Sequence, residues 1–207
     1  MRGVELPMFP LGSVLLPSTA VSLHVFEPRY RALARHCVDG DGLLGVVLIE
    51  RGREVGGGDV RFDVGTRARI ADAVELDDGR WVMAVVGEDR VRVERWLPDD
   101  PYPRAHVVAC PETAPGPDAA ARRRELEQLV RGVVASKAEL GETGAQIPAG
   151  LSPDPAVATW QAVTLAGLGP LDAQRVLETD DAAERLDVVV ALLRDEAAVL
   201  AQRLAGR

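Results

Sequence analysis

The chain has 207 residues, of which 47% are hydrophobic, and its formal net charge at pH 7 is −8. This length suffices for one large domain or two small ones, and a negative field repels phosphate backbones, which disfavours nucleic-acid binding. The apolar residues are dispersed, with no run of the ~20 that span a bilayer, and the N-terminus is a poor signal peptide, so we expect a cytoplasmic protein that does not enter a membrane.

Residues 1–112 are predicted to be rich in β-strands. Val4 and Leu6 alternate before the first proline, and Val21, Leu23 and Val25 alternate as a half-buried strand does. The continuous apolar run at 43–50 predicts a strand buried on both faces. Further alternating segments occupy 64–76, 81–87 and 90–96, and the Asp-Gly turn at 77–80 is typical of a hairpin. Together these patterns predict a small antiparallel sheet or a partly closed barrel.

A helix is predicted near residues 28–38. The sequence FEPRY (26–30) forms the corner between this helix and the preceding strand. Pro28 fits the first turn of a helix, and Glu27 places a negative charge at the helix start. Glu27 and Arg31 are four residues apart, which predicts a surface ion pair. The apolar positions then recur at helical spacing, at Tyr30, Leu33, Ala34 and Cys37.

These structural tasks leave Arg29 unexplained. Phe26, Arg29 and Tyr30 would form an exposed patch of aromatic and arginine side chains, the composition that binding hot spots favour. Arginine can donate to peptide carbonyls, and a ring can hold an apolar side chain. The candidate binding residues are therefore Phe26, Glu27, Arg29, Tyr30 and Arg31, with a structural role for the corner as the competing interpretation.

A proline-rich linker is predicted at 113–118, followed by a helical part at 119–207. Helices are predicted from 119 to 140 and from about 155 to 168, with a loop between them and a short turn at 171–178 after them. Asp181 and Glu184 have the spacing of a capping box at the start of the last helix. One apolar seam follows on that helix, suited to packing within the chain or to docking a partner: Leu186, Val190, Leu193, Ala197, Leu200 and Leu204.

The sequence carries no motif for catalysis or for a nucleotide phosphate. Ser136 and Lys137 are adjacent on a helix and diverge, so they cannot act as a dyad, and the adjacent pair His36-Cys37 cannot easily share a metal ion. Cys37 and Cys110 are expected to be reduced and buried. We expect no enzyme activity, no metal and no cofactor.

Several segments resemble, in order, the N-terminal substrate-binding domain of Lon-type ATP-dependent proteases, and most of all its short stand-alone bacterial relatives. These segments are LPMFPLGSVLLP (6–17), LHVFEPRYRAL (23–33), DGLLGVVLIERGREVG (41–56), VGTRARI (64–70), DGRWVMAVVGEDRVRV (78–93), DPYPRAHVV (100–108) and LETDDAAERLDVVVALLRDE (177–196). The resemblance implies an α+β fold in which a PUA-like, partly closed antiparallel β-barrel subdomain precedes a C-terminal helical bundle. The ATPase and protease modules of Lon have no counterpart in this sequence.

The resemblance also implies a function. In Lon proteases this domain helps to recognise unfolded or tagged polypeptides, so the first hypothesis is a non-enzymatic polypeptide-binding domain, a recognition factor or adaptor linked to proteolysis. Its partners would be unfolded or tagged polypeptides or a protease. The alternative is an RNA-binding PUA-like module, which would need a clustered arginine face formed by Arg67, Arg69, Arg90 and Arg92. An enzyme of unknown type is a third hypothesis.

Overall fold

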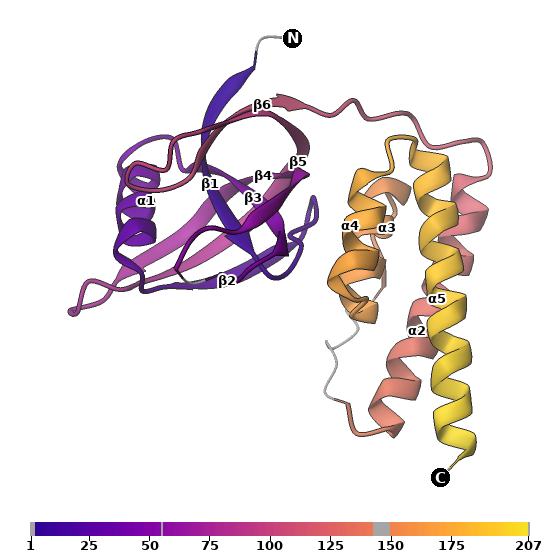
Figure 1. Cartoon of the computed structure of the whole chain (residues 1–207). Coiled ribbons are helices and arrows are strands. Elements are labelled where there is room, and N and C mark those ends of the chain that lie inside the picture. Colours follow the sequence, from indigo (N-terminus) through magenta and orange to yellow (C-terminus); the bar gives the residue numbers. More distant parts are fainter. Residues whose placement is uncertain (1–2, 55, 143–149, 207) are drawn as a thin grey trace. The chain divides into compact units, whose positions relative to one another are not determined.

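The computed structural model describes residues 3–54, 56–142 and 150–206 (Figure 1). The chain divides into two compact units between Cys110 and Pro111, here called the β unit and the helical unit. Together they give the α+β composition that the sequence predicts. None of the described helices is long and apolar enough to cross a membrane.

The β unit contains a six-stranded sheet in the order β2-β5-β4-β3-β1-β6, and β5 pairs with β6 as well. The pairings from β5 through β4, β3, β1 and β6 back to β5 therefore form a closed ring, with β2 outside it (Figure 1). Strands β1 and β3 are parallel, whereas the other described pairings between these strands are antiparallel. The elements of this unit are β1 (Val4–Leu11), β2 (Ala20–Val25), α1 (Pro28–Asp39), β3 (Leu43–Arg51), β4 (Val60–Glu75), β5 (Trp81–Leu97) and β6 (Arg104–Ala109).

Strand β1 continues through Pro7 and Pro10, although proline cannot donate to a ladder. The N–H of Met8 donates to Pro103 O on the β6 side at 2.8 Å. Since N–H groups alternate along a strand, position 7 faces β3 and position 10 faces the β6 side. Pairing with β3 begins only at Met8, and pairing with β6 ends at Pro7. Each proline thus lies where β1 has no partner to receive a hydrogen bond.

The core of the β unit lies beneath α1. The predicted helical stripe is buried, at Tyr30, Leu33, Ala34 and Cys37, and it packs against Phe9, Leu23 and Met83 of the sheet. Residues Leu44 to Leu48 of β3 are buried without interruption, which confirms a strand covered on both faces. A second cluster of buried residues, which includes Leu6, Met8 and Val107, fills the space between β1, β5 and β6.

The helical unit contains α2 (Ala119–Glu139), α3 (Pro155–Ala166), α4 (Pro170–Glu178) and α5 (Ala182–Ala205). Helices α2 and α5 run side by side (Figure 1). The Asp181 carboxylate caps α5 by accepting from the N–H groups of Ala183 and Glu184 at 2.9 and 3.0 Å. On the apolar seam of α5, Leu193 and Leu200 are fully buried within this unit, so the seam is core.

Two predictions for the helical unit are wrong in detail. The segment 171–178, predicted as a turn, belongs to helix α4. It begins at Pro170, and its stripe of Ala173, Val176 and Leu177 is buried. Helix α3 ends at Ala166 rather than near 168, because Gly167 adopts the left-handed conformation with φ of 60°. Part of the predicted loop between α2 and α3, residues 143–149, lies outside the described residues.

Candidate functional site

The candidate site lies at the corner where β2 turns into α1. Strand β2 ends at Val25 and α1 begins at Pro28, so only two residues make the turn. Glu27 has an extended backbone (φ −66°, ψ 137°), as the proline after it requires. Pro28 then starts the helix without needing an N–H partner. Phe26, the first residue of the corner, leaves 55% of its surface exposed.

Arg29 holds this corner against the loop that follows β3. Its guanidinium donates to Glu27 Oε2 and to the Glu54 carbonyl, both at 3.2 Å. The N–H of Gly56 donates to the same Glu27 carboxylate at 3.4 Å. The predicted ion pair between Glu27 and Arg31 is therefore replaced by a pair between Glu27 and Arg29, in which both side chains are mostly buried.

Tyr30 is part of an aromatic stack rather than of an exposed patch. Its ring stacks on Phe9, with the ring centroids 4.4 Å apart, and only 4% of the residue is exposed. The Arg29 guanidinium carbon lies 4.3 Å from the Tyr30 centroid. Burial removes water from the phenol and raises the pKa of Tyr30 to about 12. The prediction that Arg29 and Tyr30 are exposed beside Phe26 is thus wrong. Strand β1 covers Tyr30, and the loop after β3 engages Arg29.

A groove of about 240 Å³ opens beside this corner. Its walls come from β1, from residues Val21 to Val25 of β2, and from the loop after β3. Among the predicted candidates, Phe26, Glu27 and Tyr30 line it. Arg29 supports the corner, while Arg31 reaches the β4–β5 turn and lies against Gly79. Sequence reasoning did not single out the other lining residues that matter most, which are Phe9, Pro10, Leu11, Ser22, His24 and Glu54.

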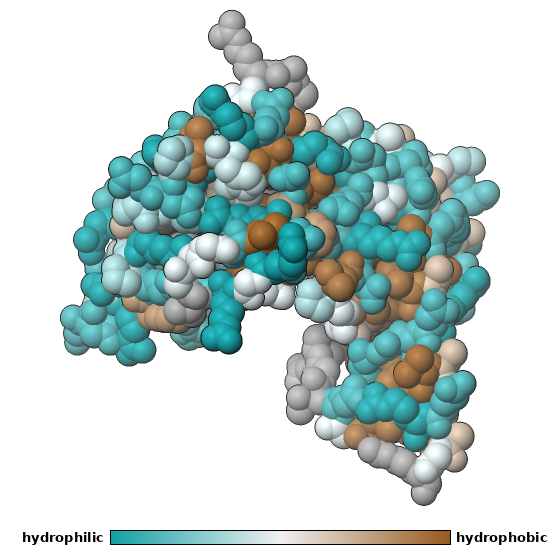
Figure 2. Space-filling view, in the orientation of Figure 1, coloured by the Kyte–Doolittle hydropathy of each residue, from teal (hydrophilic) through white to brown (hydrophobic). Residues whose placement is uncertain are grey.

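Phe26 also borders a second, smaller hollow of about 40 Å³ at the β4–β5 hairpin, lined by Leu76, Trp81 and neighbouring residues. Leu76 is itself 38% exposed. Hydrophilic residues cover most of the face visible in Figure 2, and apolar residues gather there only in small, separated patches. An exposed phenylalanine between two hollows is therefore the feature of the β unit that most resembles a binding anchor.

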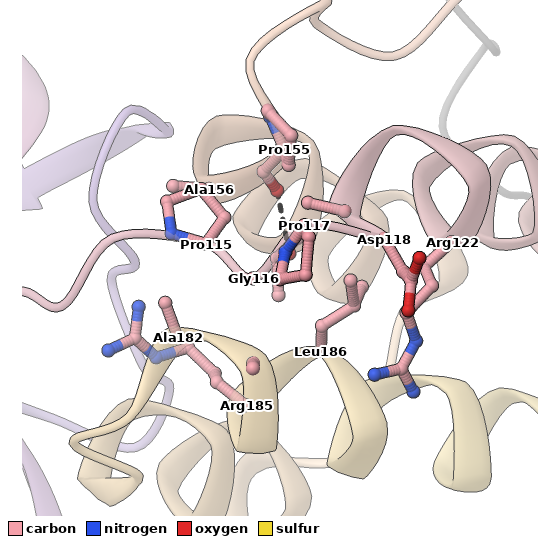
Figure 3. A pocket seen from close by; sticks show the side chains of 13 residues that line it. Pro115, Gly116, Pro117, Asp118, Arg122, Pro155, Ala156, Ala182, Arg185 and Leu186 are labelled. Atoms are coloured by element: carbon pink, nitrogen blue, oxygen red, sulfur yellow. Dashed lines mark hydrogen bonds between the residues drawn. The ribbon is translucent and has the colours of Figure 1, made fainter.

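The helical unit has a pocket of its own, of about 160 Å³, between the segment 115–118 and the first turns of α3 and α5 (Figure 3). Its most buried cation, Arg185, is 1% exposed and lies 4.4 Å from the Trp160 centroid. Arg185 donates to the Thr179 and Asp180 carbonyls and to the Glu112 carboxylate. Arg122, also at the pocket, pairs with Asp187. These charges are engaged in holding the unit together, so we favour the groove of the β unit.

Three of the four arginines that RNA binding would need are paired with carboxylates or buried. The Arg67 side chain lies 2.8 Å from Asp89, and Arg69 donates to Glu88 at 2.6 Å. Arg90 is buried, with 1% of its surface exposed. Carboxylates on β5 thus neutralise Arg67 and Arg69 of β4, and Arg90 is buried, so these three arginines do not present the unpaired positive charge that attracts phosphates.

Comparison with known proteins agrees with this architecture. The family model of the ATP-dependent protease La (LON) substrate-binding domain matches residues 5–195. Lon protease 2 of Myxococcus xanthus is 28% identical over 200 residues, which cover 94% of this chain and 24% of that protein. Lon protease 2 of Herpetosiphon aurantiacus is 29% identical over 208 residues, again with 24% of its length covered. The chain thus spans about a quarter of the length of these relatives.

Solved structures give the same result. The crystal structure of a Lon N-terminal domain protein from Xanthomonas campestris is 28% identical, with a TM-score of 0.67, and the match covers 91% of this chain and 98% of that one. The N-terminal domain of Mycobacterium avium complex Lon protease shares the fold at 18% identity, with a TM-score of 0.67 and coverage of 93% and 99%. The chain therefore belongs to the family of the ATP-dependent protease La (LON) substrate-binding domain.

Proposed function

We propose that this chain is a non-enzymatic polypeptide-binding domain that holds unfolded or tagged polypeptides at the groove of its β unit. In this role it acts as a recognition factor or adaptor for a protease. The observation that carries the proposal is the position of Phe26. The residue is 55% exposed beside the groove, while Arg29 and Glu27 fix the corner that bears it.

A fixed aromatic side chain suits this task for a physical reason. Its large apolar surface can bury an apolar side chain of a client, and little conformational entropy is lost because the corner is already ordered. Unfolded polypeptides expose apolar side chains that folded proteins bury. The groove has apolar as well as polar walls, with Phe9, Leu11 and Tyr30 among the apolar lining residues, and it would therefore favour the state of a client that exposes apolar side chains.

The proposal contains no catalytic step. Two carboxylates line the groove, and both have structural tasks: Glu27 pairs with Arg29, and Glu54 accepts a hydrogen bond from the N–H of Gly12. Purified protein is therefore expected neither to hydrolyse ATP nor to cleave casein. An activity that survived repurification and followed the protein through each step would contradict this part of the proposal.

Fluorescence anisotropy with a permanently unfolded probe tests the proposal. The probe is reduced α-lactalbumin whose cysteines are carbamidomethylated, which adds no charge, and native α-lactalbumin serves as the folded control. The protein should bind the unfolded probe and not the native one. Phe26→Ser should weaken binding at least about fivefold, in the range of a moderate hot spot. Val38→Ser is the matched control, since Val38 is 41% exposed on α1 and does not line the groove.

Both substitutions change exposed residues and should leave the free energy of unfolding within about 0.5 kcal/mol of the parent. Equal affinity for native and unfolded α-lactalbumin, or no affinity for either, would overturn the proposed function. Equal weakening by Phe26→Ser and Val38→Ser would move the binding surface away from the groove.

A further inference from the structure

Strand β2 has one free edge, and that edge faces the groove. Among the strands that the structure describes, β2 pairs with β5 only. Both β2 and β6 lie on the same side of the long strand β5, β2 against its first half and β6 against its second half. Strand β6 does not extend along the half of β5 that β2 occupies, and there the other edge of β2 borders the groove. The residues from Val21 to Val25 all line this groove.

The hydrogen bonds of β5 show which main-chain groups of β2 point to the free edge. The N–H of Gly87 donates to Thr19 O at 2.9 Å, and the N–H of Leu76 donates to Arg80 O at 2.8 Å. Odd-numbered residues at the start of β5 thus face β2, and even-numbered ones face β4. The register pairs Leu23 with Met83 without interruption along β2. By the alternation of an antiparallel ladder, the N–H and C=O groups of Ser22 and His24 point away from β5, into the open.

This free edge lacks the features that usually protect an edge strand. Natural edges carry lysine, proline or a bulge that prevents pairing with another chain. Strand β2 reads AVSLHV, with a continuous register and no proline. The opposite wall differs, because Pro10 of β1 removes the N–H that would face the groove. Of the two walls, β2 therefore offers both donors and acceptors to an incoming main chain.

The side chains around the groove match a strand with alternating character. Ser22 and His24 are exposed, whereas Leu23 and Val25 are buried. A residue paired with Ser22 or His24 would send its side chain to solvent, and the residue between them would send its side chain toward Phe9 and Tyr30. The groove has a volume of about 240 Å³. An engineered apolar cavity of about 150 Å³ holds benzene, which is about the size of an apolar side chain, so the groove has room for one such side chain.

The charge around the groove favours basic clients. The Glu54 carboxylate lines the groove, whereas the Glu27 charge is paired with Arg29, and the chain as a whole has a net charge of −8. A basic residue beside the apolar one would gain from this field, whereas an acidic one would be repelled.

We propose that an extended polypeptide segment binds as an added antiparallel strand along the free edge of β2, paired with the main chain of Ser22 and His24. An apolar side chain between the two paired residues enters the groove, and basic residues flank the segment. This inference rests on the proposed function and specifies how the client is held. Recognition through the main chain would explain how one groove accepts many sequences, since every extended segment presents the same hydrogen-bonding groups.

The test uses a seven-residue peptide in which three threonines and two valines alternate between terminal lysines. One analogue is N-methylated at the three threonines and another at the two valines. When the peptide runs antiparallel to β2 and its valines enter the groove, the threonine N–H groups face β2. Methylation of the threonines should therefore weaken binding at least tenfold, and methylation of the valines should change it less than threefold.

A pair of protein variants tests the same edge from the other side. Ser22→Pro removes an N–H that points to the open edge, a place where a sheet tolerates proline. Ser22→Ala removes the hydroxyl and keeps the main chain. Binding of the unmethylated peptide should fall at least tenfold for Ser22→Pro and remain within twofold for Ser22→Ala. Circular dichroism and thermal unfolding establish that each variant is folded, and the methylated peptides decide the question on the parent protein if Ser22→Pro does not fold.

The outcomes separate the two proposals. If the parent binds unfolded α-lactalbumin, but the two methylated peptides bind equally or folded Ser22→Pro binds like the parent, strand addition is wrong and polypeptide recognition stands. If the parent binds neither the unfolded probe nor the peptide, the proposed function fails and strand addition fails with it.

Discussion

The Arg29 guanidinium lies 4.3 Å from the centroid of the Tyr30 ring, and it also donates to the Glu27 carboxylate and the Glu54 carbonyl. One side chain thus joins the strand-to-helix corner, the aromatic stack and the loop after β3. This arrangement accounts for an arginine that the turn and the helix do not need by themselves. It also makes Arg29 a support of the groove rather than one of its walls.

Substitution of Arg29 should therefore lower the stability of the fold directly and affect recognition only through the shape of the groove. Arg29→Ala removes a cation–π contact and two hydrogen bonds, and we expect it to lower the free energy of unfolding by about 1 kcal/mol or more. Arg35→Ala is the control on the same helix, because the Arg35 side chain is 60% exposed and its ion pair with Glu75 should contribute about 0.5 kcal/mol or less. Urea denaturation measures both. An Arg29→Ala variant as stable as Arg35→Ala would show that Arg29 does not brace the corner.

Removal of the Tyr30 hydroxyl should not lower the free energy of unfolding. Its hydroxyl is buried, and within the described part of the chain it has no hydrogen-bond partner. An unsatisfied buried hydroxyl is unfavourable by about 1–3 kcal/mol, so Tyr30→Phe should leave the free energy of unfolding unchanged or raise it. Tyr30→Leu should lower it, because the stack on Phe9 is lost. Chemical denaturation of both variants is the measurement, and a large loss for Tyr30→Phe would reveal a stabilising partner for the hydroxyl.

Leu193 tests the assignment of the α5 seam to the core. The residue is fully buried in the helical unit. Leu193→Ala should lower the free energy of unfolding by about 2–5 kcal/mol, the usual range for a buried leucine. Val199→Ala, at a position on the same helix that is 51% exposed, should change it by about 0.5 kcal/mol or less. A loss below about 1 kcal/mol for Leu193→Ala would contradict the core assignment.

Local patterns in the sequence predicted the elements whose residues decide their own structure. The stripe from Tyr30 to Cys37 gave the buried face of α1, and the run at 43–50 gave the buried strand β3. Asp181 has the cap geometry that its spacing to Glu184 predicts. In each case the signal lies within a few residues, so no knowledge of distant partners was needed.

The features of the site that were missed depend on partners far away in the sequence. Tyr30 is buried because β1 brings Phe9 against its ring, and Arg29 is engaged because the loop after β3 presents the Glu54 carbonyl. Nothing in FEPRY reveals either contact. The prolines of β1 are a similar case, since a proline is compatible with a strand only where the neighbouring strand is absent, and the order of strands decides that.

Cys37 predicts how stability depends on pH. The thiol is 1% exposed, and burial, followed by the nearby Asp41 charge, raises its pKa from 9.0 to about 12. Between these values the unfolded chain releases the thiol proton while the folded chain retains it. The folded state therefore loses stability as the pH rises from about 9 toward 12, and the contribution is fully present below about pH 9. The raised pKa of Tyr30, about 12, adds a loss of the same sign above about pH 10.

Urea denaturation at a series of pH values from about 8 upward measures this dependence, with the double variant Cys37→Ala, Tyr30→Phe as the reference. The parent should lose stability more steeply than the double variant above about pH 9, because only the parent contains the two groups with raised pKa values. Equal slopes would contradict the burial of these groups. Iodoacetamide gives an independent check, since the native Cys37 thiol should resist alkylation at about pH 8 and react once urea unfolds the β unit. Peptide mapping by mass spectrometry distinguishes Cys37 from Cys110, the other free cysteine. Rapid alkylation of Cys37 in the folded protein would contradict its burial between α1 and the sheet.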